Sequence, residues 1–323
     1  MRRALALALL LASPVARADA PRAKPAALEV DRDAAPGGRL GFGFDGGAPV
    51  ETWGVSLTTS WLDRPIRLAR GTFGAGTPAS DPVRHRETVA LGAALAVGDA
   101  VVLDAIVRGS HQVGDRLHAA GDPRDLRRAV FHDLGFGARI RVAGGAARAV
   151  FLRADFTLPS GNDLHFAGDE RYTVAWSLIG RARLPADVVL AGTVGVRLHG
   201  AEVAIADRVI SDELRAAAGV EVPVAAAGAL GPLGALGALG LTGEVLAAIG
   251  DDARKLAGQA PVEARLGAIV RPQPALALGV AIGAGLDDAI GAPRWRAVAT
   301  VAWTPPADPA PARPAEPDAC GSE

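Results

Sequence analysis

The amino-acid sequence predicts an all-β fold, an antiparallel up-and-down transmembrane β-barrel of about 12 strands, within a range of about 10 to 14. Three observations support this prediction. Segments of about ten residues alternate apolar and polar side chains along most of the chain, and a tilted strand needs about 9–11 residues to cross a bilayer. Short turns and long loops alternate between the segments, as in bacterial outer-membrane barrels. Half of the residues (50%) are hydrophobic, and the apolar faces of a dozen strands exceed what one small core would use.

The N-terminus has the features of a secretory signal peptide over residues 1–20. Arg2 and Arg3 form a charged start, residues 4–12 form an apolar stretch too short for a membrane anchor, and Ala18-Asp19-Ala20 is a cleavage signal. We expect cleavage after Ala20 and export to the cell outer membrane. A proline- and alanine-rich periplasmic lead follows over 21–49.

The predicted barrel occupies 50–303, and its last ten residues, RWRAVATVAW, show the alternation clearly. Trp295, Val301 and Trp303 share one parity, and both arginines lie on the other. Because successive side chains of a strand point to opposite faces, one face is apolar and the other carries the charges. Mid-strand charges keep to one parity in each segment. The predicted strands are 51–62, 86–97, 100–111, 130–142, 147–157, 172–184, 187–199, 213–225, 236–249, 261–271, 275–286 and 293–303.

The connections predict the orientation of the barrel. An even number of strands places both chain ends on the side of the short turns, which is the periplasmic side in such barrels, and the long loops lie outside. A proline- and alanine-rich periplasmic tail follows over 304–323. The short turns are near 98–99, 144–146, 185–186 and 272–274, and the long loops are 112–129, 158–171 and 250–260.

One segment, 222–243, departs from the alternation. It carries no charge and is long enough to cross a bilayer as a helix. Glycine recurs at every third residue from Gly228 to Gly243, however, and Pro232 lies among them, which disfavours a helix. We interpret the segment as a low-complexity hairpin and leave its register open.

Aromatic residues on the apolar parity fall near the ends of the strands, where outer-membrane barrels carry aromatic girdles at the two membrane interfaces. The apolar faces would contact outer-membrane lipid and lipopolysaccharide. A last strand ending in Trp303 resembles the terminal signal read by the outer-membrane assembly machinery. The predicted girdle residues are Trp61, Phe156, Tyr172 and Trp295 near the loop end and Trp53 and Trp303 near the turn end.

Charges on the polar parity would face the lumen, and two interpretations remain open. They form either an arginine-lined constriction that favours anions or an ion-pair network that braces a narrow barrel and largely blocks it. We favour the network, because charges in a low dielectric must pair or stay hydrated. The predicted lumen-lining charges are Arg108, Arg139, Arg141, Arg153, Asp155, Arg181, Arg183, Arg197, Arg215, Glu221, Glu244, Glu263, Arg265, Arg271 and Arg296.

Other function classes have weaker support. Ser110 and His111 at the outer rim, with Asp115 and His118 in the next loop, suggest a lipid-modifying hydrolase, but adjacent strand residues point to opposite faces. The same histidines lack a recognised metal-ligand spacing. The long loops would also suit a surface adhesin or receptor.

Composition and motifs narrow the remaining possibilities. The net charge of −1 gives no support for nucleic-acid binding. The only cysteine, Cys320, cannot form a disulfide within the chain. No phosphate-binding loop, nucleophile elbow, zinc-protease or dinucleotide motif is present, so we expect no enzyme activity, cofactor or metal.

Asp163, Asp169 and Glu170 could hold calcium, although a solvated acidic loop is the simpler interpretation. A soluble β-sandwich or lipocalin-like barrel would also alternate.

Short motifs add a family resemblance over roughly 50–303. FTLPSGN at 156–162, GAPRWRAVATVAW at 291–303 before a proline-rich linker, and VALGAALAVGD at 89–99 resemble the N-terminal barrels of large OmpA-family proteins of myxobacterial type and related transporter-like barrels. Those proteins often continue into a periplasmic peptidoglycan-binding domain, and here a short tail follows instead. We therefore expect a non-enzymatic outer-membrane barrel that is structural or passes small solutes; an anion preference follows only from the arginine-lined interpretation of the lumen.

Overall fold

The computed structural model describes most of the predicted barrel. Residues 1–44 and 306–323 lie outside the described residues, so the predicted signal peptide, its cleavage after Ala20, most of the lead and Cys320 stay predictions. The described residues are 45–48, 50, 52–68, 80–115, 126–162, 165–169, 171–200, 203–205, 208–210, 212–225, 237–250, 260–287 and 291–305.

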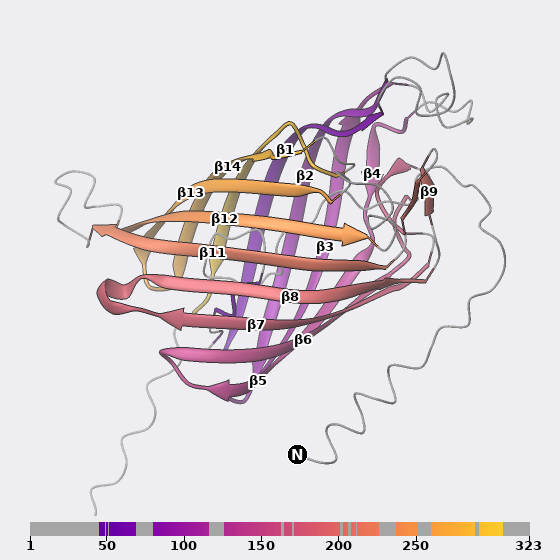
Figure 1. The fold of residues 1–323 in the computed structure, drawn as a ribbon. Helices are drawn as coiled ribbons and strands as arrows, with labels where there is room; N and C mark the ends of the chain where they lie inside the picture. Colours follow the sequence, from indigo (N-terminus) through magenta and orange to yellow (C-terminus); the bar gives the residue numbers. More distant parts are fainter. Residues whose placement is uncertain are drawn as a thin grey trace, which may run out of the picture.

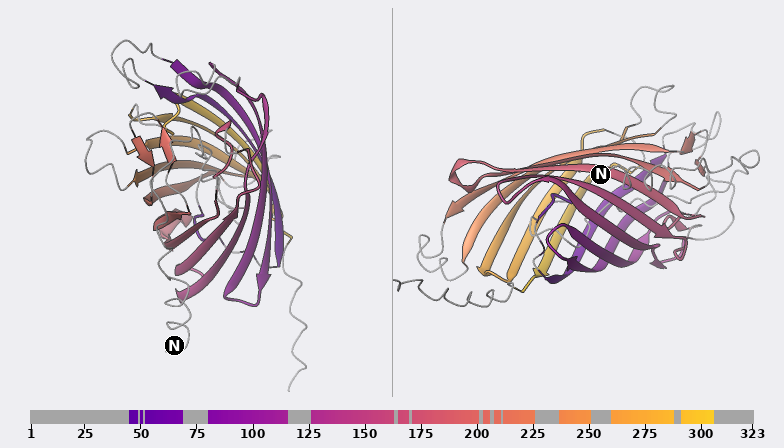
Figure 2. Two further views of the ribbon diagram at one scale, coloured as in Figure 1. Left: turned by 90° about the vertical axis from the view of Figure 1, so that its right-hand side faces the viewer. Right: turned by 90° about the horizontal axis from the view of Figure 1, so that it is seen from below.

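Twelve antiparallel strands, inclined to the barrel axis, form one closed barrel (Figures 1 and 2). Each strand pairs with its neighbours in chain order, and β15 pairs with β1 to close the ring, with Leu57 opposite Val301. The predicted fold class is confirmed. The strands are β1 (Trp53–Leu68), β2 (Ser80–Val97), β3 (Val101–Val113), β5 (Leu134–Gly144), β6 (Arg148–Leu158), β7 (Thr173–Arg183), β8 (Val189–His199), β11 (Glu213–Ala225), β12 (Ala238–Gly250), β13 (Val262–Gln273), β14 (Leu276–Gly285) and β15 (Trp295–Trp303).

Short elements lie in the connections between the barrel strands. β4 (Ala129–Phe131) pairs with the loop end of β3. The hairpin of β9 (Val203–Ile205) and β10 (Arg208–Ile210) lies between β8 and β11. A 3₁₀ turn, η3 (Pro185–Asp187), joins β7 to β8. The part of the chain that the structure describes contains no helix long and apolar enough to cross a membrane.

The strand ends differ from the prediction in two places. β1 and β2 continue past the predicted ends at 62 and 86, with register shifts after Asp63 that break the alternation used for the prediction. Beyond that point Ile66 and Val83 are fully buried, so apolar packing stabilises the longer hairpin. The predicted strand 130–142 is divided into β4 and β5, because His132 and Asp133 turn inward and are fully buried.

The segment with glycine at every third residue contributes two strands rather than a helix. β11 and β12 pair in a regular antiparallel register, with Val222 opposite Leu241 and Gly219 opposite Glu244. The turn between them, 226–236, lies outside the described residues. Pairing with β8 on one side and β13 on the other fixes the register that the sequence left open.

The outer face of the barrel is apolar and the inner face is polar. Leu266, Val280 and Ile282 are 71%, 62% and 70% exposed on the outside, whereas Arg139 and Arg296 on the inner face are almost fully buried. A soluble sheet or lipocalin-like barrel has the reverse arrangement, with its apolar side chains inside. The soluble alternatives are therefore wrong, and the polarity is that of a barrel surrounded by lipid.

The six predicted girdle aromatics lie on the outer face as three pairs. At the turn end, the rings of Trp53 and Trp303 meet edge to face, with centroids 5.0 Å apart. At the loop end, Trp61 stacks on Trp295 at 6.4 Å, and Phe156 stacks on Tyr172 at 6.0 Å. All six are about two-fifths exposed. Their role as membrane girdles stays a prediction.

Candidate functional site: the barrel lumen

The predicted lumen charges lie on the strand faces opposite the exposed apolar side chains. They differ in burial, because those near the ends of strands reach water more easily. Arg183, beside the turn residue Asp187, is exposed. The half-buried members are Arg108, Arg141, Asp155, Arg181, Arg215 and Arg271, and the buried members are Arg139, Arg153, Arg197, Glu221, Glu244, Glu263, Arg265 and Arg296.

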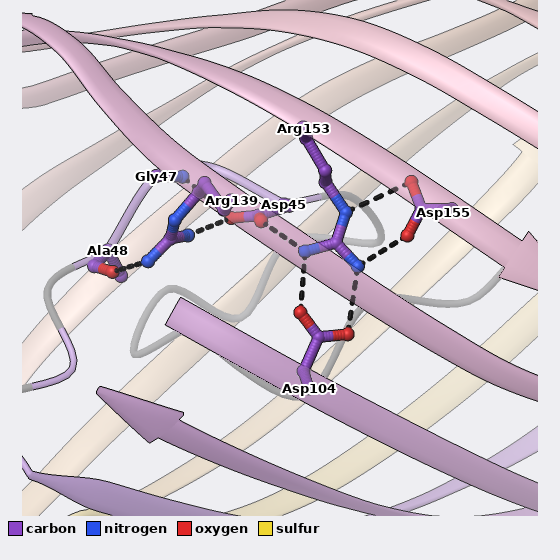
Figure 3. A network of polar contacts seen from close by, with 7 residues as sticks. All are labelled: Asp45, Gly47, Ala48, Asp104, Arg139, Arg153 and Asp155. Carbon is purple, nitrogen blue, oxygen red and sulfur yellow. Dashed lines mark hydrogen bonds and ion pairs between the residues drawn. The ribbon is translucent and has the colours of Figure 1, made fainter. Parts of the chain in front are cut away.

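Arg153, the middle residue of β6, lies at the centre of an ion-pair network (Figure 3). Its guanidinium donates two hydrogen bonds to Asp104, at 2.7 and 2.9 Å, and two to Asp155, at 3.1 and 2.5 Å. A further bond of 2.9 Å goes to Asp45. The bidentate bonds use the fork of the guanidinium group, the geometry in which such bonds are strongest. We call Asp45, Asp104, Arg139, Arg153 and Asp155 the central cluster.

A missing side chain makes room for this network. Gly137 lies between Asp104 on β3 and Asp155 on β6, in register with both. A Cβ atom on Gly137 would lie 2.3 Å from Arg153 Nη2 and 2.5 Å from Asp104 Oδ1. The glycine therefore allows Arg153 to reach across β5 and bond to the next strand.

The segment 45–48, from the predicted periplasmic lead, enters the lumen. Asp45 Oδ1 accepts a hydrogen bond from Arg139, and the Ala48 carbonyl accepts another from the same guanidinium. Gly47 packs so closely on Phe151 of β6 that a Cβ atom would lie 2.7 Å from that ring, and its φ is +68°. Glycine suits both requirements. For these four residues the expected periplasmic position is corrected: charge pairing draws them inside.

Apolar contacts and electrostatics both hold this segment in place. Ala48 is fully buried against Val189 and Ala191 of β8. Burial opposes ionisation of Asp45, but the guanidinium groups of Arg139 and Arg153 and the Gly47 N–H outweigh it, so the pKa of Asp45 lies below its ordinary value of 3.8. Asp45 is therefore an ionised internal ligand of the two arginines.

The facing wall carries a second network. Arg265 on β13 donates to Glu263 at 2.6 Å and lies 3.5 Å from Glu244 on β12. Arg296 on β15 lies 3.0 Å from the same Glu263. We call Glu244, Glu263, Arg265 and Arg296 the opposite-wall cluster.

Three further pairs extend along the wall. Arg271 bonds Glu221 at 2.6 Å, and Arg215 bonds Glu213 at 3.0 Å. These pairs, together with the two clusters, form the kind of bracing network that the sequence analysis favoured. The third, Arg197 with Asp169 at 2.7 Å, joins the wall to a loop.

That loop crosses the loop end of the lumen. Arg86 of β2 donates to the Phe166 carbonyl at 2.8 Å, and Gln112 of β3 donates to the His165 carbonyl at 2.9 Å. At the other end of the loop, Asp169 bonds Arg197 of β8, almost across the ring. Residues 165–169 therefore span the opening, with Phe166 in a left-handed conformation at φ 59°.

Ser110 and His111 of the hypothetical rim hydrolase do not pair with each other. Ser110 faces the interior and lies 2.5 Å from His132 Nε2 and 2.7 Å from Thr88 Oγ1, whereas the adjacent His111 is exposed on the outer face. Ser110 and His132 are both buried inside the barrel, away from lipid. Asp115 is bonded to Arg84 at 2.5 Å.

Metal sites find no support in the described part of the chain. No group of three or more histidine, cysteine, aspartate or glutamate side chains is arranged there to hold a metal ion. His118, Asp163 and Glu170, from the hypothetical sites, lie outside the described residues.

Sequence reasoning missed Asp45, Arg86, Gln112, His132 and Asp169 as lumen residues. Four of them lie where the alternation stops or outside the predicted strands, so parity could not assign them. The inward turn at His132 has a detectable signal, since the alternation changes phase there. For Asp45, the only indication in the sequence is its position in the glycine-rich run GFDGGA.

The lumen contains a cavity of about 240 Å³. Its charged lining combines six arginines with four carboxylates, and threonine and serine hydroxyls supply neutral hydrogen-bonding groups. Such a cavity can admit water and a small polar solute. The charged lining residues are Asp45, Asp104, Arg108, Arg153, Asp155, Arg197, Arg215, Glu263, Arg265 and Arg296.

A solved structure of an outer-membrane channel shares this fold. The COG4313 outer membrane channel from Pseudomonas putida F1 aligns with a TM-score of 0.54 at 13% sequence identity, over 79% of this chain and 96% of that chain. The NanC porin (TM-score 0.49, 5% identity, 77% and 98% coverage) and the KdgM porin (0.45, 8%, 77% and 98%) align less well. No protein-family model and no curated protein matches the sequence. The alignment with the Pseudomonas channel shows that the chain has the fold of an outer-membrane channel barrel.

Proposed function

We propose that the protein is a non-enzymatic outer-membrane barrel that passes small solutes passively. The polar cavity of about 240 Å³ inside a ring with an apolar exterior is the observation that supports this most directly. The segment 45–48 and the loop 165–169 narrow the path, so we expect a small conductance. The signal-peptide pattern supports export, and the apolar outer face supports insertion into the outer membrane.

We further propose that the channel favours anions. Six arginines against four carboxylates leave the cavity lining with an excess of positive charge. Arg141 and Arg181 add positive charge on the inner face toward the turn end. A local excess of one sign raises the concentration of the opposite ion in a narrow, low-dielectric passage.

Single-channel recording tests both statements. The mature full-length chain, reconstituted in a planar bilayer, should give discrete conductance steps, and a potassium chloride gradient should give a reversal potential on the anion-selective side. Neutralising Arg153 and Arg181 together should reduce the anion preference. Arg148→Gln, a change of the same charge at the exposed start of β6, serves as the control. A reconstituted barrel that passes no current would contradict the channel function.

Three more specific statements about the protein are also proposals. They include the resemblance to N-terminal barrels of OmpA-family proteins of myxobacterial type, contact with lipopolysaccharide, and recognition of the last strand by the assembly machinery. The outward Trp303 at the end of β15 supports the last of these. Within the described residues, no observation favours the lipid-modifying enzyme or the adhesin.

A further inference from the structure

Arg139 has an unusual set of partners. Among the described residues, its hydrogen-bond acceptors are Asp45 Oδ1 and the Ala48 carbonyl, both from the inserted segment. The two carboxylates of the adjacent wall, Asp104 and Asp155, bond to Arg153 instead. The wall thus presents an almost fully buried guanidinium whose partners come from a part of the chain outside the barrel strands.

Asp45 also bridges two arginines. One carboxylate oxygen accepts from Arg139 and the other accepts from Arg153 at 2.9 Å. The three groups form a site with the geometry of a bound carboxylate, two coplanar oxygens each facing its own cation. The aromatic ring of Phe151 lies 5.0 Å from the Arg139 guanidinium carbon and forms one side of this site.

We propose that Arg139 and Arg153 form the solute-binding site of the channel, that its ligand class is small monocarboxylates, and that Asp45 occupies the site as a displaceable internal ligand. This inference rests on the proposed channel function, and it specifies what the channel recognises. A solute carboxylate that takes the place of Asp45 restores both hydrogen-bonded ion pairs, so the exchange leaves no buried arginine unpaired.

The position of the site supports such an exchange. Asp45 and Arg153 both line the cavity, so a solute held there can reach the carboxylate without crossing the wall. The surroundings also favour a single negative charge. Asp104 and Asp155 already bond to Arg153, and a dianion such as phosphate would meet stronger repulsion from them.

Displacement of Asp45 would release the segment that narrows the lumen. With its ion pairs broken, residues 45–48 keep the hydrogen bond from Arg139 to the Ala48 carbonyl, the packing of Gly47 on Phe151 and the small apolar contacts of Ala48 with Val189 and Ala191. A carboxylate solute therefore acts both as ligand and as the signal that widens its own path. A ligand shifts such an equilibrium only through its different affinity for the two states, which direct competition supplies.

Isothermal titration calorimetry of the detergent-solubilised mature chain with sodium benzoate tests the site. Benzamide has nearly the same shape without the charge and should not bind. Asp45→Asn removes the charged competitor and should tighten benzoate binding about tenfold, about 1.4 kcal/mol. The double variant Asp45→Asn/Arg139→Gln should lose that gain.

Glu221→Gln provides the matched control, since it removes one carboxylate from the lumen elsewhere on the wall. It should change the benzoate affinity by less than about twofold. Equal affinities in the wild type and Asp45→Asn, or equal gains in Asp45→Asn and Glu221→Gln, would overturn the proposed site.

The same variants separate this inference from the channel function. If benzoate binds as expected but no variant conducts, the channel function fails and the carboxylate site stands. If the barrel conducts but benzoate neither binds nor raises the wild-type conductance relative to benzamide, the channel stands and the site fails.

Discussion

The central cluster and the opposite-wall cluster contain the same charges on their strands but connect them differently. Each has two arginines and two carboxylates on the wall itself. In the opposite-wall cluster, Arg265 and Arg296 both contact Glu263, and Arg265 also contacts Glu244. In the central cluster, both wall carboxylates bond Arg153, and Arg139 is paired by the inserted Asp45.

This difference shows that equal numbers of arginines and carboxylates on a lumen wall do not by themselves give every buried arginine a partner. A buried guanidinium needs acceptors within hydrogen-bonding distance, because an unpaired buried charge is costly. Each arginine of the opposite-wall cluster has a carboxylate partner on the strands themselves. The central cluster recruits a segment from outside the strands, and that segment narrows the lumen.

The largest expected effect comes from reversing the charge that completes the central cluster. Asp45→Lys places a third cation against Arg139 and Arg153, and a pair of like charges at about 4 Å costs about 4 kcal/mol at an effective dielectric constant of ~20. We expect the segment to leave the lumen and single-channel conductance to rise several-fold. Glu244→Lys, the equivalent reversal in the opposite-wall cluster, frees no segment and should change conductance far less. Equal changes in both variants would remove the distinction between the clusters.

Acid should weaken the central cluster through Asp45. The pKa of Asp45 lies below its ordinary value of 3.8 when the segment is docked, so ionisation stabilises docking. That contribution is complete above about pH 4 and is lost as the pH falls through the lowered pKa. Conductance recorded from pH 7 to pH 3 should rise in the acid range. Asp45→Asn should show a smaller rise.

A smaller effect is expected from the glycine that makes room for the central cluster. Gly137→Ala places a methyl group against Arg153 and Asp104, and loss of their charge-assisted bonds should cost about 2 kcal/mol. The unfolding temperature in detergent should fall accordingly. Gly180→Ala on β7 is the matched control, since a Cβ atom there meets nothing within 4 Å. A lower unfolding temperature in the Gly180 variant alone would contradict the packing argument.

The smallest effect concerns the outer face, where neither cluster contributes. A double-mutant cycle of Trp53→Leu and Trp303→Leu should give a coupling of about 1 kcal/mol, because aromatic pairs contribute about 0.5–1.5 kcal/mol beyond their buried area. Urea unfolding in lipid vesicles measures it. Conductance should stay unchanged, because these tryptophans lie on the outer face and do not line the lumen.

Parity predicted most of the barrel because each strand has two different solvents, lipid outside and a polar lumen inside. Arg153, Arg265 and Arg296 were assigned to the inner face in this way, and so were the partners Asp155 and Glu263. Parity failed at His132, where the chain bends inward, and beyond Asp63, where register shifts interrupt the alternation. It also gave no information on which carboxylate pairs with which arginine.

The alternation in the sequence predicted a barrel of about 12 strands, the direction each strand face points and the aromatic residues near the two rims, since these follow from a period of two and from strand length. The closed ring was needed to show that residues 45–48 lie inside the barrel, that loop 165–169 crosses its loop end, and that Arg139 pairs with Asp45. Those contacts join residues far apart in the chain, and they depend on which groups the closed ring leaves within reach of one another.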